Sequence, residues 1–413
     1  MLQTYRFRIY PSRKQQSRLL SSFDLCCGIY NLLLGRAKDA YEKDGTNLCS
    51  RTELYKAVQD IKEENPEFYE VHSQVLQNCA DRLAKAFNNF FRRVKRKKKG
   101  EHIKVGYPRF KKRVRSITYP QSGFAIEGNK LKVSKIGRIP IVLHREIEGR
   151  IKTLAIKRNP AGEWFAIFSC EVPRLDTDIK EHPNKDKAIG IDVGLSSFAT
   201  LSDGEKIENP HFLVKAEKRL KRVQRKHSRK KKGSQNRKKA GHKVAVLHEK
   251  VANQRADFLH KTSRRIADDY GFIAVENLNV KGMVRNGHLA KAISDAGWSQ
   301  FLQMLSCKVE KTGGIVVKVN PKNTSQTCSV CRRELKEHIP LSERTFRCPF
   351  CGYEEDRDVN ASKNILERAK ANTAGLAGIH AFGDITSTSP LEGEASGVDE
   401  QGTKNGRTVA SQL

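Results

Sequence analysis

The stretch Ala188-Ile189-Gly190-Ile191-Asp192-Val193-Gly194 ends an apolar run, typical of a buried strand, with a carboxylate. Asp is depleted in strands, and a buried carboxylate is costly unless it is paired or binds a metal. Two more acidic residues have similar surroundings: Glu276 closes the apolar run 272–275, and Asp358 stands at the start of a helical pattern. We interpret all three as ligands of divalent cations that serve phosphodiester hydrolysis.

Each of these carboxylates also has a purely structural alternative. Asp192 could be a turn residue, and Glu276 could cap the end of its strand. Asp358 could favour the dipole at the first turn of a helix. Asp356 is a rival for the third ligand position, and we prefer Asp358 because it directly precedes the helical run.

The order of elements around the carboxylates predicts the fold. The strand at 188–193 is followed by a strand at 197–201, and Ser202-Asp203-Gly204 predicts a hairpin turn into Lys206-Ile207. A strand at 272–275, a helix at 298–309, a strand at 315–319 and a helix at about 359–369 complete the pattern. This is the layout of a ribonuclease-H-like fold with a split site for two metals about 3.5–4 Å apart.

The charge of the chain indicates its partner. The 413 residues include 78 Lys and Arg against 46 Asp and Glu, a net charge of +32, which implies a polyanion. No run of about 18 apolar residues predicts a membrane span, and the N-terminus lacks the apolar core of a signal peptide. We therefore expect a cytoplasmic protein that binds nucleic acid and no membrane.

The N-terminal half predicts a helical domain inserted into a small barrel. Residues 2–10 alternate like a strand, and Pro11-Ser12 begins a helix. A second helix is expected at about 71–97, with a buried stripe of Val75, Cys79, Ala86, Phe90 and Val94. Short alternating stretches at 117–173, separated by turns, predict an antiparallel barrel. We expect the N-terminal strand to join that barrel.

Four of the ten cysteines match a zinc pattern. Cys328-x2-Cys331 and Cys348-x2-Cys351 are separated by sixteen residues, so two knuckles would complete a tetrahedral shell around one structural Zn²⁺. The alternative is two disulfides or unliganded thiols. The remaining six are expected to be small buried hydrophobic residues: Cys26, Cys27, Cys49, Cys79, Cys170 and Cys307.

Together these motifs resemble the TnpB family, the RNA-guided DNA endonucleases of insertion-sequence transposons, which are relatives of type V CRISPR effectors. The resemblance rests on Ile189–Gly194, Val275-Glu276-Asn277-Leu278, the two knuckles and Asp356-Arg357-Asp358-Val359-Asn360-Ala361. It extends to Tyr5-Arg6-Phe7-Arg8-Ile9-Tyr10-Pro11, Tyr107-Pro108-Arg109-Phe110-Lys111 and Gly378-Ile379-His380-Ala381. Ser362 stands where the family often has Ala, and both are small.

The resemblance implies a RuvC-like nuclease in which Asp192, Glu276 and Asp358 hold two Mg²⁺ ions. It implies a multidomain protein with an α/β nuclease, a β-barrel and a helical domain. We expect a wedge barrel (1–11 and 117–182) with an inserted helical recognition domain (12–116). The nuclease spans 183–322 and 356–372, with a zinc-ribbon insert that binds target nucleic acid (323–355). A tail rich in Gly, Ser, Thr and Glu (373–413) is expected to be disordered.

Basic residues predict where nucleic acid binds. From Lys218 to Lys239, 13 of 22 residues are Lys or Arg, a run that is either a solvated face or a phosphate-binding helix. Ser73, Gln74 and Gln77 are candidates for reading the flanking DNA motif, although they could be ordinary polar residues of a helix surface. The other candidate contacts are Arg92, Arg93, Lys95, Arg109, Lys218, Arg222, Arg225 and Arg229.

The function expected from these features is RNA-guided cleavage of target DNA beside a short flanking motif. The expected partners are a guide RNA and double-stranded and single-stranded target DNA, with one RNA bound to a monomer. One alternative is a nuclease-inactive guided DNA-binding repressor, which would have lost an acidic ligand. Another is a ribonuclease-H-like transposase, which would act on DNA without RNA.

Overall fold

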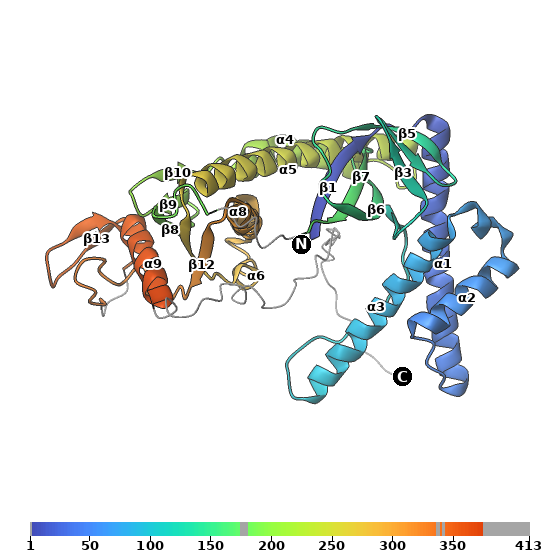
Figure 1. Cartoon of the computed structure of the whole chain (residues 1–413), viewed down its shortest axis with the longest axis horizontal. Coiled ribbons are helices and arrows are strands. Elements are labelled where there is room, and N and C mark those ends of the chain that lie inside the picture. The colour runs from blue at the N-terminus through green and yellow to red at the C-terminus, as the bar shows by residue number, and fades with distance from the viewer. Residues whose placement is uncertain (1, 174–180, 336–338, 341–342, 375–413) are drawn as a thin grey trace.

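The computed structural model describes residues 2–173, 181–335, 339–340 and 343–374. Two large sheets organise these residues, and they lie one on each side of the middle of the long axis (Figure 1). One sheet carries the helices of the N-terminal half, and the other carries the acidic residues. None of the helices in the described ranges combines the length and apolar character needed to cross a membrane.

The first sheet has seven antiparallel strands in the order β2-β6-β7-β1-β5-β4-β3. β1 (Leu2–Ile9) pairs with β7 along its whole length and with β5 at its end, which confirms that the N-terminal strand joins this sheet. Tyr5, Phe7 and Ile9 of β1 point into the core. The remaining strands are β2 (Ser116–Tyr119), β3 (Phe124–Glu127), β4 (Lys130–Val133), β5 (Gly137–Val142), β6 (Arg150–Arg158) and β7 (Trp164–Glu171).

The segment between β1 and β2 is helical, and we call helices α1–α3 the helical arm. α1 (Arg13–Asp44) begins at Ser12, whose hydroxyl accepts from the Gln15 N–H while the Gln15 side chain accepts from Ser12 N–H. α3 (Ser73–Lys98) confirms the second predicted helix. The structure adds α2 (Arg51–Glu64) and a 3₁₀ turn (Pro66–Glu70), which the sequence analysis did not predict.

Only two of the five residues predicted to be buried on α3 are buried. Val75 and Cys79 are buried, as expected, but Ala86, Phe90 and Val94 are only partly buried. The second half of α3 extends beyond the core of the helical arm and points away from the barrel (Figure 1). The apolar residues of this half recur at helical spacing, but fewer neighbouring residues of the helical arm cover them, so they stay partly exposed.

The second sheet has five strands in the order β10-β9-β8-β11-β12. β8 (Ala188–Asp192), β9 (Ser197–Leu201) and β10 (Lys206–Glu208) form an antiparallel meander, as predicted. β11 (Phe272–Glu276) and β12 (Ile315–Val319) run parallel to β8. The carboxyl ends of β8, β11 and β12 therefore lie at the same edge.

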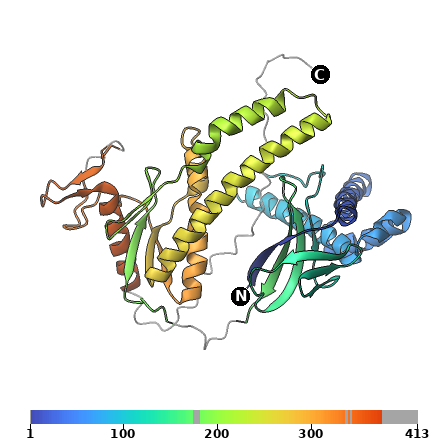
Figure 2. The ribbon, with the colours of Figure 1, turned by 90° about the horizontal axis from the view of Figure 1, so that it is seen from above.

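Helices cover both faces of the five-stranded sheet. α5 (Gln235–Asp269) and α8 (Trp298–Thr312) pack Leu259, Phe301 and Leu305 on one face. α9 (Arg357–Ala374) packs Ile365 and Ala369 on the other face, against Ala274 and Val319. α4 (Phe212–Ser228) and α5 form a long hairpin that reaches from this sheet to the barrel (Figure 2). α6 (Val280–Met283) and α7 (Ala290–Ala296) lie between β11 and α8.

The cysteine segment is inserted between β12 and α9, with a two-stranded sheet of β13 (Thr345–Arg347) and β14 (Glu354–Asp356). α9 extends to Ala374, so residues 373 and 374 of the predicted tail are helical. Residues 375–413, which include Gly378–Ala381, lie outside the described residues. Of the other six cysteines, four are buried as predicted, but Cys49 is partly exposed and Cys307 is exposed.

Candidate functional site

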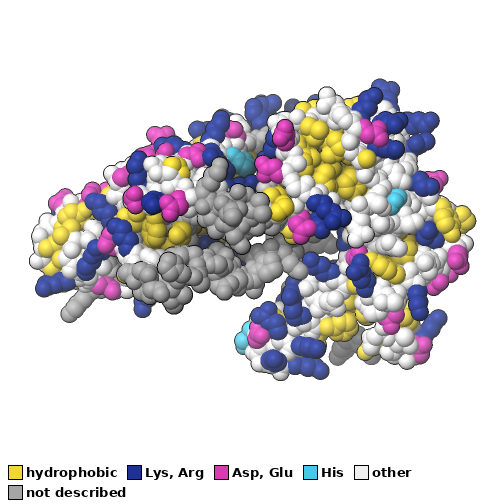
Figure 3. Space-filling model, in the orientation of Figure 1, with side chains coloured by type: hydrophobic (Ala, Val, Ile, Leu, Met, Phe, Trp, Pro, Cys, Tyr) yellow, Lys and Arg dark blue, Asp and Glu magenta, His cyan; other side chains and the backbone are white. Residues whose placement is uncertain are grey.

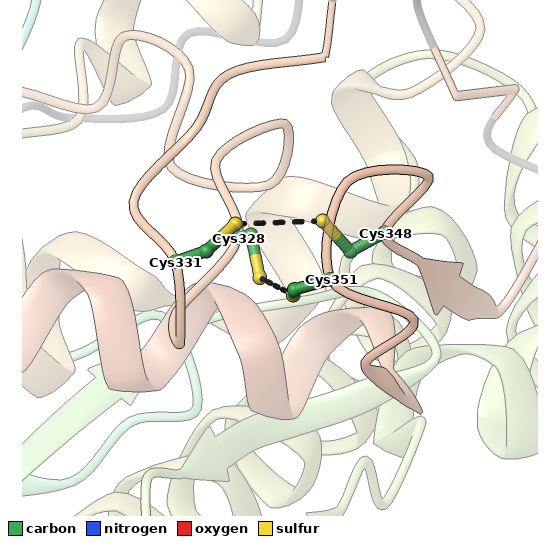
Figure 4. Close-up of side chains that lie close together, drawn as sticks. All are labelled: Cys328, Cys331, Cys348 and Cys351. Atoms are coloured by element: carbon green, nitrogen blue, oxygen red, sulfur yellow. Dashed lines mark hydrogen bonds between the residues drawn. The ribbon is translucent and has the colours of Figure 1, made fainter.

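The four cysteines converge at one point. Their sulfur atoms all lie within 4.8 Å of one another, with Cys328 Sγ 3.7 Å from Cys351 Sγ and Cys331 Sγ 3.6 Å from Cys348 Sγ (Figure 4). Bonded sulfurs would be about 2.05 Å apart, so these are free thiols. A tetrahedral zinc with bonds of about 2.3 Å separates its sulfurs by about 3.8 Å. The cluster therefore fits a closed, structural zinc site.

The second knuckle favours thiolate at Cys348 only. The Tyr353 N–H opposes a rise in the pKa of Cys351, but burial and the neighbouring thiols raise that pKa to about 12, and burial raises the pKa of Cys328. Burial raises the pKa of Cys348, but the N–H groups of Phe350 and Cys351 and the neighbouring thiols outweigh it. The net effect lowers the pKa of Cys348 to about 7. Zinc requires the deprotonated form, so the fold reduces the work of removing that proton.

The acidic residues are brought together by strand register and by one close helix contact. The parallel pairing of β8 and β11 places Val275 beside Ile191, so the next residues in each strand are Glu276 and Asp192. α9 packs across the face of the sheet formed by β8 and β11. A Cβ atom on Gly190 would lie 2.1 Å from the Ser362 carbonyl oxygen, so only glycine allows this approach.

That contact places Asp358 close to Asp192. From Gly190 to Asp192 the strand rises about 6.6 Å on one face, and from Ser362 back to Asp358 the helix rises about 6 Å on one face. Asp192 and Asp358 therefore both lie near the contact of Gly190 with Ser362, and the charge of Asp358 acts on Asp192. Ser362 is buried, and its hydroxyl donates to the Val359 carbonyl within α9.

The electrostatics of Asp192 indicate that both other carboxylates lie close to it. Burial, then the charge of Glu276, then that of Asp358 raise the pKa of Asp192 well above its usual range. Burial also raises the pKa of Glu276, although a hydrogen bond from Thr324 and the charge of Arg368 oppose the rise. Such crowded carboxylates are the oxygen ligands that a divalent cation stabilises.

The carboxylates are less closely assembled than the cysteines. In the part of the chain that the structure describes, only the cysteine cluster has ligand atoms that all lie within 4.8 Å of one another. Asp358 instead lies 3.5 Å from the Arg344 guanidinium and 3.6 Å from that of Arg357. The donor set suits a cation, but the oxygens do not yet converge on a single point.

Asp356, the rival to Asp358, has a different role in this structure. One of its oxygens accepts from the N–H groups of Asp358 and Val359 and so caps α9. Its other oxygen lies 2.6 Å from the Lys206 ammonium on β10. Among the contributions to the pKa of Asp192, that of Asp356 is smaller than that of Asp358. The geometry favours Asp358 as the third ligand.

The segment that leads into the first knuckle touches both centres, a link that sequence reasoning missed. Thr324 donates to Glu276 Oε1 at 2.6 Å. The buried Asn360 of α9 accepts from the Ser329 N–H at 2.9 Å and donates to the Thr327 carbonyl at 2.9 Å. Asn364 donates to the carbonyls of Thr324 and Thr327. The only signal in the sequence was Asn360 inside the Asp358 motif.

The candidate nucleic-acid contacts differ in how exposed they are and in whether they already form hydrogen bonds within the protein. Ser73 is exposed, but Gln77 is partly buried, and the side-chain Oε1 of Gln74 accepts from the Ser122 N–H and hydroxyl at 3.0 Å. The basic candidates are exposed: Arg92, Arg93, Lys95, Arg109, Lys218, Arg222, Arg225 and Arg229. A hollow along α4 is lined by Lys221, Gln224, Arg225, Ser228 and Arg229.

A basic surface joined to a split acidic centre and a cysteine ribbon is characteristic of nucleic-acid-processing proteins. Family models agree. Residues 168–287 match a model described as a probable transposase, and residues 298–365 match the TNB domain of Cas12f1-like proteins. Residues 1–46 match a model described as a helix-turn-helix domain, although here they form one strand and one long helix.

Whole-chain relatives extend this similarity. A protein of Streptomyces pristinaespiralis, named "Putative RNA-guided DNA endonuclease", is 36% identical over 90% of each chain. InsQ of Escherichia coli K12, which carries the same description, is 30% identical over 90% of this chain and 93% of its own. The TnpB-like protein L770 of Acanthamoeba polyphaga mimivirus is 25% identical over 88% of this chain and 72% of its own. This chain belongs to the TnpB family.

Proposed function

We propose that this protein is a transposon-encoded RNA-guided DNA endonuclease that cleaves target DNA beside a short flanking motif. The observation that carries the proposal is the position of Asp192 at one edge of the five-stranded sheet, where burial and the charges of both Glu276 and Asp358 raise its pKa. Family membership and the names of the relatives support the reaction class.

The five-stranded domain is ribonuclease-H-like in this proposal. Its strand order, with an antiparallel meander on one side and two parallel strands on the other, supports that assignment. The domain boundaries in this proposal are those expected from sequence, with a wedge barrel, a recognition domain, a divided nuclease and a zinc-ribbon insert, except that the last nuclease segment ends at Ala374. The pairing of β1 with β7 supports one barrel built from two segments.

Asp192, Glu276 and Asp358 would hold the metal ions, and two bound Mg²⁺ would activate the attacking water and stabilise the leaving 3′ oxygen. Thr324 orients Glu276 by donating to one of its oxygens and leaves the other free for ligation. Arg344 and Arg357 balance part of the charge of Asp358. Because water attacks the phosphorus, no side chain has to act as a nucleophile.

The partners in this proposal are a guide RNA and target DNA, with one RNA bound to one chain. The net charge of +32 and the exposed arginines and lysines of α3 and α4 support binding along a phosphate backbone. Base pairing with the guide would read the target, and the protein would read the flanking motif. Ser73, Gln74 and Gln77 remain the candidate readers.

The test uses the full chain purified with its flanking locus. The copurified RNA is sequenced, and the complex is given Mg²⁺ and a plasmid library with a randomised flank. We expect one discrete RNA and cleavage beside one short motif. Asp192→Ala should lower cleavage by more than about a hundredfold without weakening RNA or DNA binding, and Asp39→Ala, at an exposed site on α1, should cleave normally.

The same experiment separates the alternatives. A guided repressor would bind the motif and leave the plasmid uncut. A transposase would act on DNA without the RNA and would join strands. Retained cleavage by Asp192→Ala would refute the metal-ligand assignment.

A further inference from the structure

The segment that follows α3 presents aromatic side chains to solvent beside positive charge. Residues 101–111 form neither helix nor strand, and Phe110 is 57% exposed. Tyr107 is 43% exposed and Phe91, on the last turns of α3, is 39% exposed. A single exposed aromatic residue is ordinary, so its surroundings decide whether Phe110 has a role.

The chain on either side of Phe110 is held in place. Asn31 of α1 accepts from the Lys111 N–H at 2.8 Å and donates to the Lys111 carbonyl at 2.9 Å. The Lys111 ammonium lies 3.6 Å from the centre of the Tyr30 ring. On the other side, the Tyr107 ring packs edge-on against Phe87 and Phe90 at 5.7 and 5.3 Å. The exposure of Phe110 is therefore imposed by its neighbours.

Positive charge surrounds this fixed segment. Arg109, Lys112 and Arg113 are exposed, and none of them forms an ion pair with a carboxylate in the described residues. Lys and Arg side chains also gather at the free end of α3 (Figure 3). An exposed ring flanked by unpaired cations is the arrangement that binds single-stranded nucleic acid, in which bases stack on rings and phosphates contact cations.

We propose that Phe110 stacks on an unpaired base of the bound RNA, and that Arg109, Lys112 and Arg113 contact the adjoining phosphates. This inference rests on the proposed function. RNA is the favoured source of the base because the guide occupies the protein before any target arrives. Tyr107 and Lys111 act as positioning residues that keep the segment rigid.

The test measures the affinity of the full chain for the RNA that copurifies with it, transcribed and labelled, at several salt concentrations. Phe110→Ala should weaken binding by about tenfold or more, because stacking on one aromatic residue is worth that much. Phe110→Leu should weaken it similarly, since leucine is apolar but has no ring face, and Phe110→Trp should bind normally. Tyr41→Ala is the matched control, because Tyr41 is an exposed aromatic residue on α1.

Salt dependence separates stacking from charge. Arg109→Ala should reduce the slope of log affinity against log salt by about 0.7, whereas Phe110→Ala should leave the slope unchanged. Chemical probing of the RNA should show a local gain of reactivity in Phe110→Ala. Wild-type RNA affinity in Phe110→Ala, or a loss confined to target DNA binding, would overturn the inference. Failure of any RNA to copurify would instead refute the proposed function.

Discussion

The cysteine cluster and the acidic site both border α9, yet they are built in opposite ways. The cysteines come from two short turns within 328–351, and their sulfurs already lie about as far apart as zinc requires. The acidic residues come from β8, β11 and α9, and the charges of Glu276 and Asp358 raise the cost of ionising Asp192. A closed structural shell is a local property of the sequence, whereas an open acidic site is a property of the whole fold.

The largest expected effect tests whether the two centres are independent. Cys328→Ser should lower the zinc content from about one ion per chain toward zero, because a buried ligand is lost. We also expect cleavage to fall by more than about a hundredfold, because the knuckle backbone holds Asn360 two residues from Asp358. Elemental analysis and a plasmid cleavage assay measure the two effects.

Cys307→Ser is the matched control, since Cys307 is exposed and lies outside the cluster. It should retain both zinc and activity. If Cys328→Ser lost its zinc and still cleaved DNA at the wild-type rate, the zinc ribbon would not support the acidic site at all.

The second prediction tests the close contact of β8 with α9. Gly190→Ala should destabilise the protein by about 1–3 kcal/mol, because the new methyl group would displace the Ser362 backbone. Cleavage should fall by about 10- to 100-fold as Asp358 moves away from Asp192. Thermal unfolding and cleavage by the RNA-loaded protein measure these changes.

Gly35→Ala provides the contrast. Gly35 lies inside α1, and a Cβ there meets no atom within 4 Å. That variant should gain about 0.5–1 kcal/mol of stability and should cleave normally. Equal behaviour of the two variants would mean that the approach at Gly190 does not position the site.

The sequence predicted the local features of the protein well and the features that depend on the whole fold poorly. The knuckles, the strands that carry Asp192 and Glu276 and the hairpin to Lys206 were all predictable, because spacing and alternation are local signals. The extent of burial along α3 was not, because periodicity identifies an apolar face but not how far its partner extends. The bond from Thr324 to Glu276 joins residues 48 positions apart, and only the fold brings them together.

That bond gives the third prediction. Thr324→Val should raise the Mg²⁺ concentration needed for half-maximal cleavage by about tenfold, because Glu276 loses the partner that orients it. The bond also lowers the pKa of Glu276, so its loss should raise that pKa and make the defect larger at acidic pH. Thr324→Ser keeps the hydroxyl and should behave like the wild type. An equal defect in both variants would point to packing rather than to the hydrogen bond.

The smallest expected effect concerns the free energy of unfolding that the protein loses by ionising the buried Asp192 without a metal. The pKa of Asp192 is raised in the folded protein, so its contribution to stability is fully present below the unfolded pKa of about 3.9 and is lost as the pH rises through the folded value. At neutral pH without magnesium, Asp192→Asn should therefore melt at a higher temperature than the wild type. The difference should disappear near pH 4.

Magnesium should reverse this order, since it stabilises the ionised carboxylates of the wild type and has less to bind in the variant. Thermal unfolding in zinc-replete buffer, with and without Mg²⁺, measures both signs, and Asp39→Asn controls for the loss of a negative charge elsewhere. If Asp192→Asn melted below the wild type without magnesium, the acidic site would be held by favourable contacts like the cysteine cluster. In that case the acidic site would not differ from the cysteine cluster, because both would be stable before their metals bind.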